Sequence, residues 1–552
     1  MTARIAGHLA DAFHERRAND RQVTMSTVAE ATYELLRSFK MTKVFGNPGS
    51  TELPFLKDFP EDFTYVLGLH EGAVVGMADG YAQGMGRAAF VNLHTAAGLG
   101  NASAAIMTAH HNRTPLVITA GQQDRRQLAY QPFLSGRLVE MALPYVKWSH
   151  QPDRAEDVPA AIERAYHTAM QAPRGPAFVS IPMNDWEAET EPHEPREIDY
   201  RTAPSPEALD KAAQALQSSQ RPAIVAGGGV DRAGAWYDAV ALAERLNAAV
   251  WADPMHHRAG FPQDHSLFQG VLPPAQVKIA EALSEYDVVL VLGAPVFRYF
   301  QYLPGAPVEK GTRVIHVTDN PEEASRAATG TGVMGDVKLA IRQLLERLPK
   351  EADRPAPPLP AEIPEPEAKD SLPADYVLHT LARYLPDQVI VVEETPSSRM
   401  LLHKHVPIKV PGGFYSAASG GLGFGTSASV GLKLAQSDRP VVCIVGDGSL
   451  MYALQALWSA AQYRVDVTFV VMNNRQYKIL RLLGEMGGAG EGVPGLDLPE
   501  LDIVGAARSL GCEGASVNSP EELPDALESA LNARRPYVLN VLVDPNIPKS
   551  LE

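Results

Sequence analysis

Two polar turns in the C-terminal third of the chain carry side chains that suit a metal ion. The apolar run VVCIVG leads into Asp447 and Gly448, and the next apolar run, VTFVVM, leads into Asn473 and Asn474. The carboxyl ends of neighbouring parallel strands meet at one sheet edge, so we expect the Asp447 carboxylate and the Asn474 amide to lie close together. Carboxylate and amide oxygens suit Mg²⁺, which completes its coordination with water and a diphosphate.

Each turn alone has an ordinary structural explanation. Gly-Asp-Gly is a common turn, and Asn-Asn commonly ends a strand. The combination favours a binding site, because both turns close apolar runs and one helical stretch separates them. The glycines beside Asp447 would also let the backbone approach a diphosphate closely.

The elements that must position these turns repeat along the chain. Short apolar runs alternate with helical stretches, which predicts an α/β fold of βαβ units around doubly wound parallel sheets. The first and third blocks of this pattern are candidates for one shared fold. The predicted strands lie in TKVFG, FTYVLG, AAFVNLH, PLVITAG and PAFVSIP of the first block, in RPAIVAGG, AAVWADP, YDVVLVLGAP and TRVIHVT of the second, and in DQVIVVEE, RPVVCIVGDGS, VTFVVMNN and PYVLNVLVD of the third.

Length and linker composition predict three domains. A chain of 552 residues is too long for one core, since single cores rarely exceed about 250 residues. Two proline-bearing charged segments, which start at Trp186 and Lys350, interrupt the alternation and indicate linkers. The predicted parts are an N-terminal extension at 1–25 and three domains at 26–185, 205–349 and 372–548.

Composition argues against several kinds of partner. The formal net charge of −16 does not suit a nucleic acid or an anionic membrane surface. No run reaches the ~18 apolar residues of a spanning helix, and residues 1–24 lack the apolar core of a signal peptide, so we expect a cytoplasmic protein. Cys443 and Cys512 have no zinc-site spacing and are interpreted as buried thiols. The glycine cluster from Ala223, AIVAGGGVDRAGA, is weak evidence alone, and we assign no nucleotide to it.

A family resemblance starts from the two polar turns. GDGS followed by NN resembles the cofactor motif of thiamine-diphosphate enzymes. FGNPGSTELPFL, LHEGAVVGMADGYAQ, NLHTAAGLGNA and PLVITAGQQ resemble the decarboxylases of that family, the benzoylformate decarboxylases most closely. The similarity continues through YVKWSH, GAPVFRY, ASGGLGFG and VPGLDLP and covers nearly the whole chain after residue 25. It implies a pyrimidine-binding, a middle and a diphosphate-binding domain, in that order.

The resemblance implies a thiamine diphosphate and Mg²⁺ site. Leu422 matches the apolar residue that holds the cofactor bent, and Glu71 matches the carboxylate that bonds the pyrimidine ring. A bent cofactor brings its amino group beside the reactive carbon, and Glu71 helps that group act as a base. The implied metal ligands are Asp447, Asn474 and the backbone of Gln476, and the implied cofactor contacts are Glu71, Gly420, Leu422, Gly448, Ser449 and Tyr477.

Two further catalytic residues follow from the resemblance. Ser50, in the NPGS turn, matches the serine that bonds the substrate carboxylate or developing alkoxide, and His94 matches a histidine that relays protons. Without the resemblance, a serine in such a turn and a histidine after a strand are usually structural. His70, beside Glu71, has no required counterpart and is interpreted as structural.

The substrate cavity departs from the family pattern. Phe300 stands where the family has a second active-site histidine, and a phenyl ring cannot exchange protons. Ile479 replaces a small residue, and Ser416 replaces an aromatic one. We therefore expect a rearranged apolar cavity formed by Phe133, Leu134, Phe300, Pro396, Ser416, Ile479, Leu480 and Leu483.

The favoured function is removal of CO₂ from a 2-oxo acid to give an aldehyde. The missing histidine keeps a carboligase or lyase of 2-hydroxy ketones as an alternative, and an acetolactate-synthase-like enzyme is another. A non-catalytic cofactor-binding subunit is disfavoured, because Glu71, Asp447 and Asn474 are all present. The expected partners are a small 2-oxo acid or aldehyde and further copies of the chain, since the family builds its sites between subunits, at least as a dimer and commonly as a tetramer.

Overall fold

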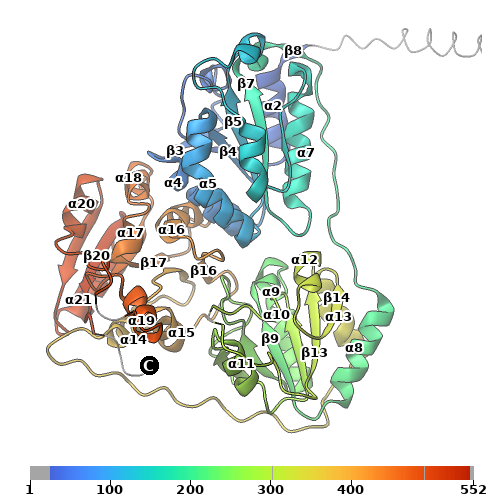
Figure 1. Cartoon of the computed structure of the whole chain (residues 1–552), viewed down its shortest axis with the longest axis vertical. Helices are drawn as coiled ribbons and strands as arrows, with labels where there is room; N and C mark the ends of the chain where they lie inside the picture. The colour runs from blue at the N-terminus through green and yellow to red at the C-terminus, as the bar shows by residue number, and fades with distance from the viewer. Residues whose placement is uncertain (1–24, 301, 490–491, 547–552) are drawn as a thin grey trace, which may run out of the picture.

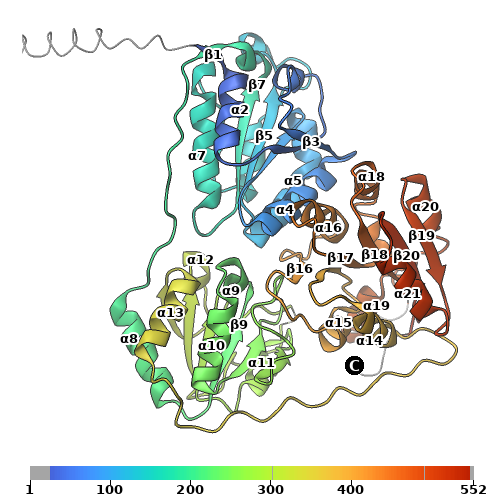
Figure 2. The ribbon, with the colours of Figure 1, turned by 180° about the vertical axis from the view of Figure 1, so that it is seen from behind.

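The chain forms three parallel six-stranded sheets with helices on both faces (Figures 1 and 2). The computed structural model describes residues 25–300, 302–489 and 492–546. Apart from Met25, the predicted N-terminal extension lies outside the described residues. The predicted α/β class with doubly wound parallel sheets is confirmed.

The first sheet is buried between two helical layers. Helices α2 (Val28–Ser38) and α7 (Val158–Met170) cover one face, and α4 (Glu71–Met85), α5 (Thr95–Asn112) and α6 (Leu138–Ala142) cover the other. Its strands are β2 (Lys43–Gly46), β3 (Thr64–Leu67), β4 (Ala89–Leu93), β5 (Leu116–Gln122), β6 (Ser149–His150) and β7 (Pro176–Pro182). Their order in the sheet is β3-β2-β4-β5-β7-β6.

The middle sheet has a different strand order. Helices α8 (Pro206–Ser218), α10 (Trp236–Leu246) and α13 (Val337–Arg347) pack on one face, and α11 (Gln276–Ala282) packs on the other. Its strands are β9 (Pro222–Ala226), β10 (Ala249–Ala252), β11 (Phe268–Val271), β12 (Val288–Leu292), β13 (Arg313–Thr318) and β14 (Thr331–Met334). The order β11-β10-β9-β12-β13-β14 is that of dinucleotide-binding folds. Two short helices, α9 (Gly228–Arg232) and α12 (Pro321–Ser325), follow β9 and β13.

The third sheet repeats the topology of the first. Helices α14 (Ala374–Tyr384), α15 (Arg399–His405) and α21 (Leu523–Leu531) cover one face, and α16 (Phe424–Ala435), α18 (Gln455–Gln462) and α20 (Ile503–Ser509) cover the other. Its strands are β15 (Ile390–Glu394), β16 (Phe414–Ser416), β17 (Val441–Gly446), β18 (Val467–Asn473), β19 (Glu513–Val517) and β20 (Tyr537–Leu542). The order β16-β15-β17-β18-β20-β19 matches that of the first sheet, strand for strand. The expectation that these two blocks share a fold is confirmed.

Small residues join the first and third units within one chain. Helices α4 and α16 pack closely, because Gly80 lies on the backbone of Ala428, and Gly431 lies on the backbone of Met77. A side chain at either glycine would overlap that backbone. One apolar cluster therefore runs from the first sheet through α4, α5 and α16 into the third sheet.

The two linkers run over the surface and are mostly extended (Figure 1). The first starts later than the sequence suggests. Trp186 is buried against Phe55, and β8 (Glu189–Thr190) pairs antiparallel with β1 (Ser26–Thr27). This part of WEAET is tied down because a buried indole and backbone pairing outweigh its acidic composition. No helix in the described part of the chain is long and apolar enough to cross a membrane.

Candidate active site

The carboxyl edge of the third sheet brings the two predicted metal-binding turns together. Asp447 follows β17 and begins the short helix α17 (Asp447–Leu450), and β18 beside it ends at Asn473. One Asp447 carboxylate oxygen accepts the Gly448 N–H at 2.9 Å, and the other accepts the Arg475 N–H at 2.8 Å. Burial raises the pKa of the Asp447 carboxyl. A cation beside it would offset that cost and favour the charged form.

The same turn offers two more oxygens of the kind that Mg²⁺ prefers, the side-chain oxygen of Asn474 and the backbone carbonyl of Gln476. The Asn474 side-chain oxygen accepts the Gln476 N–H at 3.1 Å, which folds the turn back on itself. Arg475, between them, has a positive φ of 59°. The described residues contain no group of three or more His, Cys, Asp or Glu side chains placed to hold a metal. The predicted site is of another type, with one carboxylate, one amide and one carbonyl, and that donor set fits Mg²⁺.

Residues beside Asp447 form a tightly packed turn. A side chain at Gly448 would overlap the Tyr477 ring, so only glycine fits there. Ser449 is buried in the same turn, and Tyr477 stands just before helix α19 (Lys478–Met486). Gly448, Ser449 and Tyr477 thus lie together around Asp447, as the resemblance implies for a diphosphate site.

Leu422 lies in a loop between two glycines in left-handed conformations. Gly420 has a φ of 72° and Gly423 a φ of 96°, which other residues rarely adopt. The Glu394 carboxylate accepts the Gly423 N–H at 2.7 Å and the Gly425 N–H at 2.5 Å. Burial raises the pKa of Glu394 to about 8. The half-buried Leu422 is therefore presented by a fixed backbone at the start of α16.

Glu71 lies at the start of α4, on the first sheet. Its two carboxylate oxygens accept the side-chain amides of Asn47 at 3.4 Å and Asn101 at 3.0 Å. Gly98 on α5 also lies against the carboxylate. The preceding His70 caps this helix by accepting the Gly72 N–H at 3.0 Å, so its structural interpretation is confirmed. Two amides and a glycine thus hold the Glu71 carboxylate in place.

His94 follows β4 and is oriented by a buried acid. Its Nδ1 lies 2.8 Å from a Glu52 carboxylate oxygen and 3.1 Å from the Thr51 hydroxyl. The Glu52 side chain is fully buried and also accepts the N–H groups of Gly49 and Gly121. Nδ1 thus donates to Glu52, which leaves Nε2 as the nitrogen able to exchange a proton.

The NPGS turn lies directly on this histidine. A side chain at Gly49 would overlap the imidazole, so the glycine permits the close approach. Ser50, the next residue, is exposed. The structure therefore brings Ser50 and His94 together at one edge of the first sheet.

The predicted cavity residues divide between separate parts of the fold. Phe133 is 88% exposed, Phe300 is 64% exposed and Leu480 is 46% exposed, while Leu134, Ile479 and Leu483 are half-buried. Pro396 is exposed after β15, and Ser416 is buried at the end of β16. Ile479, Leu480 and Leu483 share α19, beside the Asp447 turn.

The two groups of site residues do not meet within one chain. Among the residues that the structure describes, no hydrogen bond or ion pair joins Ser50, Glu71 or His94 to Asp447, Asn474 or Gln476. The first group lies at the first sheet and the second at the third sheet (Figure 1). The two groups therefore stand on separate sheets of one chain.

The glycine cluster of the middle sheet serves packing. The Gly227 and Gly229 N–H groups donate to the carbonyls of Leu292 and Gly293, at 2.9 and 2.8 Å. Their Cα atoms face the Gly293–Ala294 backbone, where a side chain would not fit. These amides are therefore occupied and not free for a phosphate, although the strand order is that of a dinucleotide fold.

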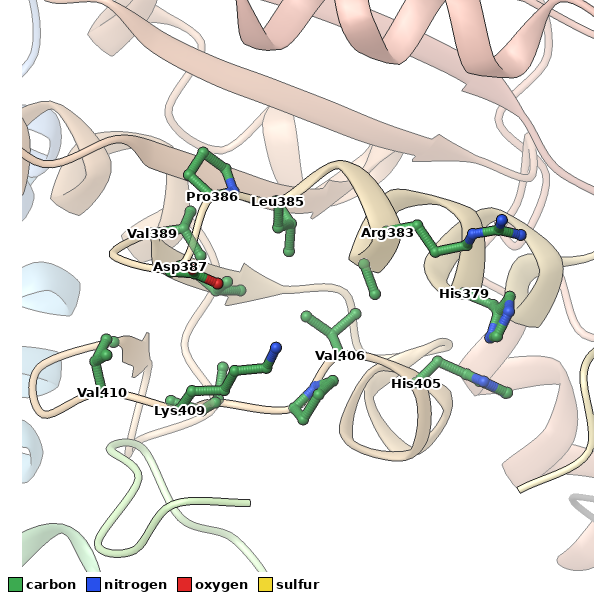
Figure 3. A pocket seen from close by; sticks show the side chains of 15 residues that line it. His379, Arg383, Leu385, Pro386, Asp387, Val389, His405, Val406, Lys409 and Val410 are labelled. Carbon is green, nitrogen blue, oxygen red and sulfur yellow. The ribbon is translucent and has the colours of Figure 1, made fainter. Parts of the chain in front are cut away.

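A cavity of about 220 Å³ lies elsewhere in the third unit (Figure 3). Its lining comes from α14, from the start of β15 and from the segment between α15 and β16, with Arg383 and Lys409 at its polar margin. As far as the described residues go, none of the predicted site residues lines it. The cavity is therefore separate from the candidate site.

Comparison with known proteins identifies the family. Residues 26–143 match the N-terminal TPP binding domain of thiamine pyrophosphate enzymes, 209–344 match their central domain, and 395–541 match their C-terminal TPP binding domain. The chain belongs to the thiamine pyrophosphate enzyme family. This cofactor is thiamine diphosphate, so the resemblance seen in the motifs is confirmed.

Several similar proteins within this family are decarboxylases, and others are acetolactate synthases. Benzoylformate decarboxylase of Pseudomonas aeruginosa is 44% identical over 527 residues, which cover 94% of this chain and 99% of that protein. The crystal structure of benzoylformate decarboxylase from Polynucleobacter necessarius matches with a TM-score of 0.92 at 40% identity, covering 95% of this chain and 99% of that one. The 4-hydroxybenzoylformate decarboxylase of Rhodococcus jostii RHA1 matches with a TM-score of 0.92 at 41% identity, covering 95% and 100%. This chain is a thiamine-diphosphate-dependent enzyme similar to these decarboxylases.

Sequence reasoning missed the residues that hold the site residues in place. Asn47, Asn101 and Glu52 contact Glu71 or His94, yet asparagines and a glutamate near turns look ordinary in sequence. Asn47 begins the NPGS turn and Glu52 follows it by two residues, and this turn was the one available signal. At the third sheet, Arg399 donates to Glu393 at 2.5 Å and to Ser416 at 2.7 Å. Ser416 is therefore part of a charged cluster, a polar addition to a cavity expected to be apolar.

Proposed function

We propose that this chain is a thiamine-diphosphate- and Mg²⁺-dependent decarboxylase that converts a benzoylformate-like or aliphatic 2-oxo acid into CO₂ and an aldehyde. The observation that carries the proposal is the Asp447 turn. A buried carboxylate, an amide oxygen and a carbonyl lie at one sheet edge beside a glycine that leaves room for a diphosphate. The 44% identity to a benzoylformate decarboxylase supports the same reaction class.

Each group of residues has a distinct part in this proposal. Asp447, Asn474 and the Gln476 carbonyl hold Mg²⁺, and Gly448 with Ser449 admits the diphosphate. Thiamine diphosphate, when bound, supplies the electron sink for loss of CO₂. Glu71, fixed by Asn47 and Asn101, bonds the pyrimidine ring and holds a proton there.

The substrate contacts come from the NPGS turn and its neighbour. Ser50 hydrogen-bonds the substrate carboxylate. His94, whose Nδ1 is engaged by Glu52, exchanges a proton through Nε2. Leu422 supports the cofactor from the α16 side, and the Ile479, Leu480 and Leu483 face of α19 packs against the substrate side chain.

The proposed enzyme is a homo-oligomer, commonly a tetramer in its family, with each site between two chains. The separation of Glu71 from Asp447 within one chain supports this, as does the exposure of Phe133 and Phe300. We assign the pyrimidine-binding domain to 26–185, the middle domain to 205–349 and the diphosphate-binding domain to 372–548. Analytical ultracentrifugation of the purified protein tests the assembly, and a stable monomer that retains activity would contradict it.

The function is tested with a panel of 2-oxo acids. Protein dialysed against EDTA is assayed for CO₂ and aldehyde with benzoylformate, 4-hydroxybenzoylformate and a branched aliphatic 2-oxo acid, with thiamine diphosphate and Mg²⁺ added singly and together. We expect turnover only with both additions. Turnover without either, or none on any acid with both, would contradict the proposal.

Phe300 favours a second candidate, a carboligase. A phenyl ring at this position cannot protonate the product of CO₂ loss, which leaves more time for attack on an aldehyde acceptor. Phe300 lies close in sequence to Arg298, which donates to the Ala418 carbonyl at 3.1 Å, in the loop that leads to Leu422. Product analysis with added acetaldehyde distinguishes the two, since a carboligase yields a 2-hydroxy ketone in place of free aldehyde.

A further inference from the structure

The loop that presents Leu422 is held by all three units of the chain. We call residues 416–423 the Leu422 loop. At its start, the Ser416 N–H donates to the His257 carbonyl of the middle unit at 3.0 Å. At its end, the Gly423 N–H donates to Glu394 of the third unit at 2.7 Å. The central contacts come from α5 of the first unit and from Arg298 of the middle unit.

Asn112, the last residue of α5, makes the most buried of these central contacts. Its side chain is fully buried, and its oxygen accepts the Ala418 N–H at 2.8 Å. Its amide group donates to the buried Asp79 carboxylate on α4 at 2.9 Å. That carboxylate also accepts Gln83 at 2.8 Å and Thr114 at 2.5 Å. The Asn112 side chain therefore cannot turn away from Ala418 without leaving buried polar groups unpaired.

Two further contacts hold the loop at Ala418 and Ser419. The Arg298 guanidinium donates to the Ala418 carbonyl at 3.1 Å. The Thr108 hydroxyl lies 2.9 Å from the Ser419 hydroxyl, and that hydroxyl accepts the Gly421 N–H at 3.0 Å. The N–H and the carbonyl of Ala418 are thus bound by Asn112 and Arg298, which lie outside the third unit, although the loop belongs to that unit.

The first and third units do not need these hydrogen bonds in order to pack together. Helices α4 and α16 already join the first and third units through close glycine contacts. The polar contacts concentrate instead on a loop whose Gly420 and Gly423 are in left-handed conformations. A backbone with two such glycines has few constraints of its own, so its position depends on these external hydrogen bonds.

We propose that Asn112 is a positioning residue for the cofactor. With Thr108, it holds the Leu422 loop in one position and thereby sets the affinity of the enzyme for thiamine diphosphate. This rests on the proposed function, in which Leu422 supports the bound cofactor. A loop that must be ordered at the moment of binding lowers affinity, whereas a loop fixed in advance does not. Asn112 touches neither substrate nor cofactor and acts through the Ala418 peptide.

The test compares two variants that disturb the same buried carboxylate. Asn112→Leu removes the contact to Ala418 together with one bond to Asp79. Thr114→Val removes a different bond to Asp79, at an equally buried position, and leaves the loop contact intact. The dissociation constant of thiamine diphosphate is measured by calorimetry on apo-protein with Mg²⁺ present, and the Tm of each apo-protein is recorded.

We expect Asn112→Leu to bind thiamine diphosphate about tenfold more weakly, the equivalent of one lost hydrogen bond and one orphaned N–H. Thr114→Val should lower Tm by a similar amount and leave the dissociation constant within about twofold of wild type. Equal weakening in both variants, or none in either, would overturn the positioning role.

A milder pair at Thr108 keeps the proposal testable if Asn112→Leu does not fold. Thr108→Val removes the hydroxyl that meets Ser419, and Thr108→Ser retains it. We expect weaker cofactor binding in the valine variant and recovery in the serine variant. Identical dissociation constants in both would overturn the proposal. If wild-type protein itself binds no thiamine diphosphate, the proposed function fails first, and that outcome is separate from equal binding by all variants.

Discussion

The first and third sheets have the same topology, but different chemical groups follow their strands. Counted in chain order, the strands of each sheet lie in the order 2-1-3-4-6-5. The third strand of the first sheet is followed by His94, whereas the third strand of the other sheet is followed by Asp447. The loop after the second strand leads to Glu71 in one and to Leu422 in the other. The helices that follow, α4 and α16, pack on each other.

On the proposed assignment, one fold presents either half of a cofactor site. On the first sheet, side chains hold the functional groups: Asn47 and Asn101 hold Glu71, and Glu52 holds His94. On the third sheet, backbone N–H groups hold Asp447 and Asn474. The first arrangement suits proton transfer, because side-chain partners tune a titrating group, and the second suits a metal and a phosphate, because a rigid backbone fixes oxygens and leaves space.

The largest expected effect is at Glu71, on the proton-handling side. Glu71→Gln keeps the shape of the side chain but loses its charge and one of the two oxygens that accept the Asn47 and Asn101 amides. We expect hydrogen–deuterium exchange at the reactive cofactor carbon to slow by about 10²–10⁴-fold, the size of a general acid–base contribution. NMR of quenched samples measures it, and an unchanged exchange rate would show that this carboxylate does not activate the cofactor.

On the metal side, Asp447→Ala should abolish tight cofactor binding and leave the fold intact. Losing an outer-shell partner of a metal typically costs 10–100-fold, so losing the carboxylate ligand should cost more than about 100-fold in Mg²⁺ affinity. Calorimetry with Mg²⁺ and thiamine diphosphate measures this. Asp336→Ala, which removes the cap of α13 in the middle unit, is the matched control and should bind normally. Full activity of the Asp447 variant after EDTA dialysis would reject the site.

Glu52 tests whether side-chain support matters on the first sheet. Glu52→Gln weakens the hold on His94 Nδ1, and we expect kcat to fall by roughly 10–100-fold, less than in His94→Ala. The double variant should lose little more than His94→Ala alone, because the two residues act as one unit. Additive losses in this cycle would separate the two roles.

Ile479 tests the substrate side of the third unit. Each methylene of fit is worth roughly 1–3 kcal/mol in discrimination, so Ile479→Ala should raise the kcat/KM ratio of benzoylformate to a branched aliphatic 2-oxo acid by about tenfold. The same ratio in Leu482→Ala, a change on the same helix but outside the predicted cavity set, serves as the control. An unmoved ratio in the Ile479 variant would remove this residue from substrate selection.

The last expected effect concerns stability and not activity, namely its pH dependence at the Leu422 loop. Burial raises the pKa of Glu394 from 4.5 to about 8, so the folded state holds a proton that the unfolded state releases above pH 4.5. The stability linked to this group is therefore present near pH 4.5 and is lost as pH rises toward about 8, by up to about 1.4 kcal/mol per pH unit. Urea unfolding of wild type and Glu394→Gln at fixed protein concentration measures the difference, and the variant should show the shallower decline. Parallel pH profiles would contradict the assignment.

The sequence by itself determined the central strands and the chemistry at their ends. Parallel strands buried on both faces must be continuously apolar, so runs such as VVCIVG and VTFVVM were legible, with Asp447 and Asn474 after them. In the three six-stranded sheets, the strands it did not reveal are β6, β11, β14, β16 and β19, and each of them lies at the edge of its sheet. An edge strand has one neighbour and partial exposure, so its composition is mixed and carries no clear periodic signal.

Only the tertiary structure decided which residues hold the site residues and which parts meet. Asn101 reaches Glu71 across 30 positions, and Asn112 reaches Ala418 across 306. Such contacts depend on how helices cross, which no local pattern encodes. The structure also decided that Gly227 and Gly229 pack against a neighbouring backbone, and that Glu71 and Asp447 begin helices of two different units. Local sequence fixes the group at each strand end, and the packing of the units fixes which groups come together.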